Sequence, residues 1–163
     1  MKKYIPNIIL IILLVAVDQL IKVLILGSIG ASGESITIIP RVLQLSYVEN
    51  AGGAWGIFSE RIYLIGIDLM IIIAILKLLL DKKYEFDKKA ILGMTLILAG
   101  GIGNLMDRII RGFVIDYFDI TPIFDYPVFN FADICIVVGV ILLFIIIIVN
   151  TVKSQEKSID EKV

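Results

Sequence analysis

The stretch PVFNFADICIVVGVILLFIIIIVN, from Pro127 to Asn150, is almost entirely apolar from Phe131 onward, yet it contains an aspartate at position 133. Since about 20 helical residues cross the hydrocarbon core of a bilayer, the stretch predicts a membrane-spanning helix. Asn130 can cap this helix with Asp133 as its partner in the first turn, where a negative charge also suits the helix dipole. Asp133 therefore has both a structural and a functional interpretation.

The composition of the chain limits the chemistry that it can perform. Of 163 residues, 59% are hydrophobic, far more than in a soluble domain, and the net charge of −1 indicates no nucleic-acid partner. The chain has no histidine and a single cysteine, Cys135. Intrachain disulfides, Cys/His zinc sites and Ser–His or Cys–His dyads are therefore excluded. Any acid–base chemistry must use carboxylates.

Four segments are long and apolar enough to span a membrane, at about residues 5–26, 62–80, 90–110 and 131–149. The basic start and apolar run of the first also fit a signal peptide. We interpret it as a retained helix, because the polar residues Asp18, Gln19 and Lys22 follow with no small-x-small cleavage site behind them. The fold prediction is an all-α membrane protein in which residues 1–152 form one transmembrane domain.

The distribution of basic residues predicts the orientation of these helices. The N-terminus, the loop between the second and third spans and the tail carry nine lysines, whereas the other loops and span ends carry four arginines. The excess of positive charge places both termini and the middle loop in the cytoplasm. The loops at 27–61 and 111–130 then lie outside, and the polar tail at 153–163 is predicted to be cytoplasmic and disordered.

The first outer loop has the pattern of short strands. SITIIPRVLQLSYVEN, residues 35–50, alternates in strand fashion, and Pro40 divides it. We therefore expect a small β-structure over about residues 34–56. The glycine-rich segment AGGAWGIF at its end, with Trp55, predicts a mobile flap over about residues 50–58 or an anchor at the membrane surface.

Polar residues of all four spans fall at one depth. Because successive helices alternate in direction, the late residues of the first and third and the early residues of the second and fourth lie near the outer face. Ionisable groups cost roughly 2.5–3.5 kcal/mol each inside a span and normally face the bundle interior or a water-filled cavity. We therefore predict a shared polar pocket, formed by Asp18, Lys22, Asp68, Asn104, Asp107, Arg108, Asn130 and Asp133.

The local spacing of these residues allows structural interpretations as well. Asp18 and Lys22 stand at i, i+4, so they can simply neutralise each other. Asn104, Asp107 and Arg108 share one helix face and could be a polar cluster at a helix end. Just before them, the small-xxx-small pattern of residues 99–103 predicts close helix packing.

The loop after the third span contains one aspartate in an unusual setting. In RGFVIDYFDI, Asp116 is enclosed by apolar residues on both sides, which is rare for a surface-loop acid. Asp119 and Asp125, by contrast, are predicted to be ordinary solvated loop acids. Asp116 is therefore the second candidate for carboxylate chemistry.

Five short motifs resemble, in order, those of the lipoprotein signal peptidase (signal peptidase II) family. They are DQLIK at 18–22, NAGGAWG at 50–56, GNLMDR at 103–108, GFVIDY at 112–117 and FNFAD at 129–133. Each is weak alone, but five in register over nearly the whole chain form a specific pattern.

The resemblance implies a multi-pass intramembrane aspartyl protease of the bacterial cell membrane, with four helices, a small extracytoplasmic β-cradle and a loop helix on the outer face. It implies removal of the signal peptide from diacylglyceryl-modified prolipoproteins, just before the lipidated cysteine, by a monomer in contact with membrane lipids and without cofactor or metal. The implied dyad is Asp116 and Asp133. The implied substrate-binding or supporting residues are Asp18, Lys22, Asn50, Gly52, Asn104, Asp107, Arg108, Asn130 and Ala132.

These residues suggest specific roles. Two carboxylates that share one proton can activate water and polarise a peptide carbonyl, although the sequence does not decide which one carries the proton. Asn104 and Asn130 are expected to orient the carboxylates or the substrate, Arg108 to bind carbonyl or ester oxygens, and Asp107 to hold Arg108 or a nearby group.

Two alternatives belong to other functional classes. Intramembrane acids also mark ion paths, so a small proton-coupled transporter is possible, although the acids gather in the outer half without a relay across the membrane. A non-catalytic scaffold that binds a lipid head group in the polar pocket is the second. A hydrolase with a metal held only by carboxylates is a weaker third.

Overall fold

The computed structural model describes residues 4–52, 61–81 and 83–160, and it contains four apolar helices and a small sheet. Each helix is long and apolar enough to cross a membrane, as the sequence predicted. The helices are α1 (Ile5–Ile25), α2 (Arg61–Leu80), α3 (Lys88–Ile110) and α4 (Phe131–Asp160), and a π-helical segment, η2 (Leu26–Gly30), continues α1. The strands are β1 (Ile36–Ile39), β2 (Leu43–Asn50) and β3 (Val114–Asp119).

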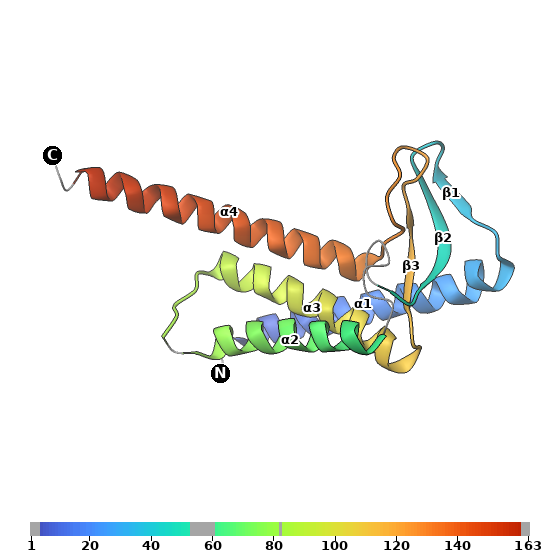
Figure 1. The fold of residues 1–163 in the computed structure, drawn as a ribbon, viewed down its shortest axis with the longest axis horizontal. Helices are drawn as coiled ribbons and strands as arrows, with labels where there is room; N and C mark the ends of the chain where they lie inside the picture. Colours follow the sequence, from blue (N-terminus) through green and yellow to red (C-terminus); the bar gives the residue numbers. More distant parts are fainter. Residues whose placement is uncertain (1–3, 53–60, 82, 161–163) are drawn as a thin grey trace.

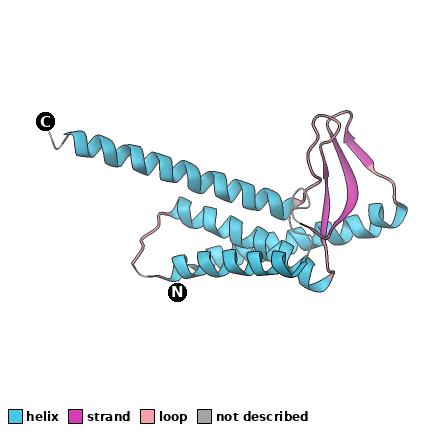
Figure 2. Ribbon diagram, viewed as in Figure 1, coloured by secondary structure: helices cyan, strands magenta, loops and turns pink. Residues whose placement is uncertain are grey.

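The sheet stands at one end of the helix bundle, across the direction of the helices (Figures 1 and 2). We call this the sheet end. At the opposite end, α1 begins, α4 ends and the connection from α2 to α3 turns back (Figure 1). The late residues of α1 and α3 and the early residues of α2 and α4 are therefore brought to the sheet end.

Helix α3 is the central element of the bundle and packs against each of the other three helices. Small residues allow these contacts to be close, as the 99–103 pattern predicted. A Cβ atom added at Gly100 would lie 2.2 Å from the carbonyl oxygen of Ala132 in α4, and one at Gly103 would lie 2.7 Å from Oδ2 of Asp18 in α1. The packing thus brings backbone and carboxylate groups directly against α3.

The three strands form an antiparallel sheet in the order β1-β2-β3. The division at Pro40 is as predicted, whereas β3 was not anticipated. Side chains alternate across β3, so Ile115 and Tyr117 pack with Ile25 and Ile29 at the end of α1, while Asp116 faces the other way. The strand therefore turns the carboxylate of Asp116 towards the bundle.

Two expectations about the ends of the molecule have different outcomes. The prediction of a disordered tail is wrong for the described residues, because α4 continues to Asp160. The Lys, Gln and Glu residues of this segment are good helix formers, and extending a helix is easier than starting one. The expected loop helix is not found in the described segments 33–52 and 111–130, and residues 53–60, with Trp55 and most of the expected flap, lie outside the described residues.

Candidate active site

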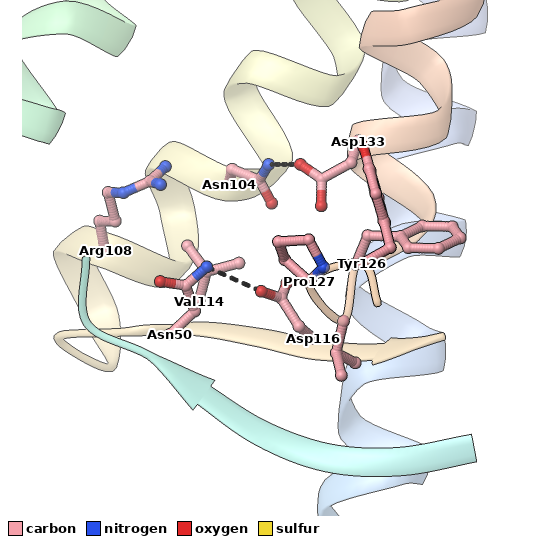
Figure 3. A pocket seen from close by; sticks show the side chains of 10 residues that line it. Asn50, Asn104, Arg108, Val114, Asp116, Tyr126, Pro127 and Asp133 are labelled. Carbon is pink, nitrogen blue, oxygen red and sulfur yellow. Dashed lines mark hydrogen bonds between the residues drawn. The ribbon is translucent and has the colours of Figure 1, made fainter. Parts of the chain in front are cut away.

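Asp116 and Asp133 face one cavity at the sheet end, although they come from different elements (Figure 3). Asp116 projects from β3, and Asp133 lies in the first turn of α4. The cavity has a volume of about 220 Å³. Its wall is completed by Asn50, Asn104, Arg108, Val114, Tyr126, Pro127, Val128 and Phe129. Four separate parts of the chain therefore enclose two carboxylates.

Asn130 is fully buried and connects the two carboxylates. Its side-chain amide donates a hydrogen bond to Oδ1 of Asp116 at 2.6 Å, and its backbone N–H donates to Oδ2 of Asp133 at 3.0 Å. The backbone N–H of Asp133 donates in return to Oδ1 of Asn130 at 3.0 Å. The two residues thus form the reciprocal cap that the sequence predicted for the start of α4. The cap and the cavity use the same carboxylate.

Two further amides each hold one carboxylate (Figure 3). Nδ2 of Asn104 donates to Oδ1 of Asp133 at 2.8 Å, and Nδ2 of Asn50 donates to Oδ2 of Asp116 at 2.8 Å. The backbone N–H of Gly52 donates to Oδ1 of Asn50 at 3.1 Å, which fixes the orientation of that amide. Each aspartate therefore accepts hydrogen bonds from two residues, and both still face the cavity.

The surroundings of Asp116 favour its protonated form. Its pKa is raised to about 7, chiefly because the carboxyl is buried and next because the negative charge of Asp133 acts on it. The hydrogen bonds from Asn50 and Asn130 and the positive charge of Lys22 lower the pKa, but they do not outweigh burial. Asp116 can therefore hold or release a proton near neutral pH.

A buried charge cluster lies behind the carboxylates. Nζ of Lys22 is 2.9 Å from Oδ2 of Asp18 and 2.9 Å from Oδ2 of Asp107, and all three side chains are almost completely buried. The second oxygen of Asp18 accepts a hydrogen bond from the backbone N–H of Ala132 at 3.1 Å. The pair of Asp18 and Lys22 is thus part of a larger cluster that joins α1, α3 and α4.

Of the two expectations for Asp107, the structure shows the second: it holds nearby groups and not Arg108. Asp107 pairs with Lys22 and Arg111, and NH1 of Arg108 is 2.8 Å from Oδ2 of Asp68 in α2. Neighbouring residues of a helix point in different directions, which explains why Asp107 does not hold Arg108. Arg108 itself lines the cavity.

Asp119 is not the solvated loop acid that the sequence suggested. It is buried, and its carboxylate accepts hydrogen bonds from Gln44, Ser46 and Thr121. Burial acts to raise the pKa of Asp119, but these hydrogen bonds outweigh it and hold the pKa at about 2. Asp119 therefore ties β2 to the end of β3, away from the cavity. Asp125 is exposed, as predicted.

Two residues that the sequence did not assign to the site contribute to it, because Gln19 and Arg111 both hold Asp107. Asp68, which was predicted in the polar pocket without a role of its own, holds Arg108. The available signal was a polar residue at the depth of the pocket. Gln19 lies within the motif at 18–22, and Arg111 follows the last residue of α3. Among the described residues, no group of three or more carboxylates and thiols could bind a metal ion.

The chain is similar to known proteins over most of its length. The model of the signal peptidase (SPase) II family matches residues 10–149. Relatives named lipoprotein signal peptidase include those of Clostridioides difficile (39% identical, over 91% of this chain and 98% of the relative) and Staphylococcus aureus strain Newman (34%, over 97% and 98%). A bacterial membrane enzyme solved by the in meso method at 2.3 Å resolution superimposes with a TM-score of 0.79, at 30% identity over 90% of this chain and 89% of that one.

Proposed function

Because the chain belongs to the signal peptidase II family, we propose that it removes signal peptides from prolipoproteins as an intramembrane aspartyl endopeptidase. Asp116 and Asp133 are the catalytic pair in this proposal, and the substrate is a diacylglyceryl-modified prolipoprotein cleaved just before its lipidated cysteine. The observation that carries the proposal is that both carboxylates face one cavity and are tied together by Asn130.

Two carboxylates that share one proton can hydrolyse an amide. The ionised carboxylate takes a proton from water, whose oxygen attacks the carbonyl carbon while the protonated carboxyl donates its proton to the carbonyl oxygen. The tetrahedral intermediate then returns a proton to the carboxylate that donated it, and the carboxyl that took a proton from water passes that proton to the leaving nitrogen as the C–N bond breaks. The raised pKa of Asp116, about 7, supports placing the shared proton on Asp116 and the base on Asp133.

The remaining cavity residues have supporting roles in this reaction. Asn50, Asn104 and Asn130 hold the two carboxylates through the hydrogen bonds described above. Arg108, held by Asp68, is placed to bind a substrate carbonyl or a lipid ester oxygen. Gly52 and Ala132 act through backbone N–H groups, which orient Asn50 and Asp18.

The proposed placement in the membrane follows the distribution of charge. Residues 1–152 form one catalytic membrane domain, with both termini in the cytoplasm and the sheet end at the outer face. The exposed apolar surfaces of the helices contact lipid. A substrate whose acyl chains remain in the bilayer can then bring its cleavage site to the cavity at the level of the sheet.

The test is a digest of a diacylglyceryl-modified prolipoprotein and of its unmodified form by the purified protein in lipid. Asp116→Asn and Asp133→Asn should each abolish cleavage of the lipid-modified substrate while the protein remains folded, because a neutral amide can neither accept nor share the proton. Asp125→Asn, an exposed acid outside the cavity, is the matched control and should retain activity. Substantial turnover by either cavity variant would refute the proposed pair.

A further inference from the structure

Lys22 makes one contact that charge neutralisation does not explain. The side chain is fully buried in α1 and already lies 2.9 Å from each of two carboxylates, those of Asp18 and Asp107. Its third hydrogen bond goes to a neutral group, Oδ1 of Asn104, at 3.1 Å. An ammonium group has three donors and no acceptor, so this bond constrains the amide that receives it.

The side-chain amide of Asn104 can satisfy its neighbours in only one orientation. Its oxygen accepts from Nζ of Lys22 and from Nδ2 of Asn130, both at 3.1 Å. Its nitrogen donates to Oδ1 of Asp133 at 2.8 Å. A flipped amide would turn its NH₂ group towards two donors and its oxygen towards a carboxylate, so all three contacts would become unfavourable.

We propose that Lys22 is a positioning residue that fixes the amide of Asn104, so that this amide donates to Asp133 and holds the carboxylate towards the cavity. Asn130 donates to the same oxygen of Asn104, but its own amide is held by Asp116 and by the backbone N–H of Asp133, so its orientation depends on these other partners. Lys22 has no acceptor, so it can only donate to Asn104. The inference rests on the proposed proteolysis and adds a specific role for a residue that does not line the cavity.

Lys22 is itself held in place by a network that extends to the end of α3. Oδ1 of Asp107 accepts from Nε2 of Gln19 at 3.0 Å and from Arg111, and Oδ2 accepts from the backbone N–H of Ile115 at 3.2 Å. The charges of Lys22 and Arg111 balance those of Asp18 and Asp107. The cluster is therefore neutral as a whole. Its specific contact with the groups that hold Asp133 is the hydrogen bond from Lys22 to Asn104.

Other charged groups also face the catalytic pair and must stay constant in a test. Asp68 from α2 and Arg108 from α3 form an ion pair beside the cavity, and the charge of Asp68 interacts with that of Asp133. The charge of Lys22 acts on Asp116 as well. Removing Lys22 alone would leave the cluster with one excess negative charge. Its effect on activity could then arise from the changed charge or from the lost orientation of the Asn104 amide, and the experiment would not separate the two.

The variant that separates these effects is Lys22→Met combined with Asp18→Asn. It removes one positive and one negative charge, so the cluster stays neutral while the donor to Asn104 is lost. We expect kcat for the lipid-modified substrate to fall by about tenfold or more, because the carboxylate of Asp133 is no longer held in position. KM should change less than twofold, because the groups that bind the substrate are unaffected.

Asp18→Asn alone serves as the comparison. It keeps Lys22 and its bond to Asn104, so it should lower the thermal stability and affect kcat less than the double variant does. Loss of folding alone would lower the yield of active protein but would not lower kcat per folded molecule. An equal kcat for the single and double variants would overturn the inference.

A double-mutant cycle with Asn104→Ala gives the decisive measurement. If Lys22 acts through Asn104, removing Lys22 and Asp18 in the Asn104→Ala background should reduce kcat by no more than about twofold further. A full additional loss would overturn the inference while leaving the protease proposal intact. If Lys22→Met does not fold, the same cycle with Lys22→Gln applies, because Gln also removes the donor-only constraint. The protease proposal fails separately, if Asp116→Asn or Asp133→Asn retains turnover.

Discussion

Replacing Asn50 by leucine should move the pH dependence of cleavage in a direction that the structure specifies. Nδ2 of Asn50 donates to Oδ2 of Asp116 at 2.8 Å, and this bond favours the ionised carboxylate and lowers its pKa. Leucine has a similar size and no donor. The pKa of Asp116, about 7 in the wild type, should therefore rise in the variant.

The size of the shift follows from the strength of such a bond. A hydrogen bond to a charged group contributes about 1.5–3 kcal/mol, and one pKa unit corresponds to about 1.4 kcal/mol. Because Asn50 is half-buried, the lower end of the range applies, and we expect a rise of about one unit. The singly protonated pair is lost as the pH rises, so the alkaline limb should move from about pH 7 in the wild type to about pH 8 in Asn50→Leu.

The assay is kcat/KM for a lipid-modified prolipoprotein between pH 5 and 10, since this ratio reports the ionisation of the free enzyme. The matched control is Glu49→Gln, the neighbouring residue of β2, which is exposed and whose carboxylate accepts from the Tyr47 hydroxyl at 2.8 Å. Its alkaline limb should coincide with that of the wild type. A limb that stays near pH 7 or moves to lower pH in folded Asn50→Leu would refute the reasoning.

Three other variants test separate parts of the structure. Gly100→Ala brings a methyl group 2.2 Å from a backbone oxygen of α4, so cleavage and thermal stability should both fall strongly, whereas Gly101→Ala, with its nearest contact at 3.6 Å, should preserve both. Asp68→Asn frees Arg108, so KM for the lipid-modified substrate should rise several-fold with a smaller change in kcat; an unchanged KM would exclude this role. Asp119→Asn should cost about 2 kcal/mol of stability at neutral pH; because the folded pKa is depressed to about 2, the difference from wild type in denaturant unfolding should shrink as the pH falls below about 4.

The convergence of polar residues could be predicted from the sequence because an unpartnered ionisable group inside a membrane span is costly. Inside a span every ionisable group needs a partner or water, so the depth of Asp18, Lys22 and Asp133 in their helices carried real structural information. The length of the apolar runs predicted four helices, and the alternating pattern of residues 35–50 predicted a small β-structure; the structure confirms both. The prediction worked where one physical constraint acts on whole segments.

The partners of individual charges could not be obtained from depth alone. Asp107 and Arg108 are neighbours in sequence, but successive residues of a helix diverge, so the two side chains meet different helices. Helix geometry excludes their pairing, whereas the choice of Asp68 as the partner of Arg108 depends on how α2 rotates against α3. That rotation follows from packing, which one sequence does not reveal.

The strand β3 was missed for a related reason. Five of its six residues are buried, and they lie on both faces, so the alternation that reveals a half-buried strand is absent from its sequence. Burial on both faces also explains Asp119, which looks like a loop acid but is held by groups from β2 once the strands pair. The environment of such a residue depends on strand register, which involves contacts between distant parts of the chain.

At Asp133 the structural and the chemical role use the same hydrogen bonds. As a cap, Asp133 accepts from the backbone of Asn130, and as a cavity residue it accepts from the amide of Asn104. The hydrogen-bond donors that stabilise the carboxylate of Asp133 at the membrane edge also orient it towards the cavity. The same groups therefore serve the fold and the proposed chemistry. It follows that a Ser or Thr at position 130 could still cap α4 but could not bridge to Asp116 as the amide does. The expected result is a stable α4 with Asp116 and Asp133 out of alignment. Such a variant would separate the two roles that Asn130 combines, capping the helix and bridging the carboxylates.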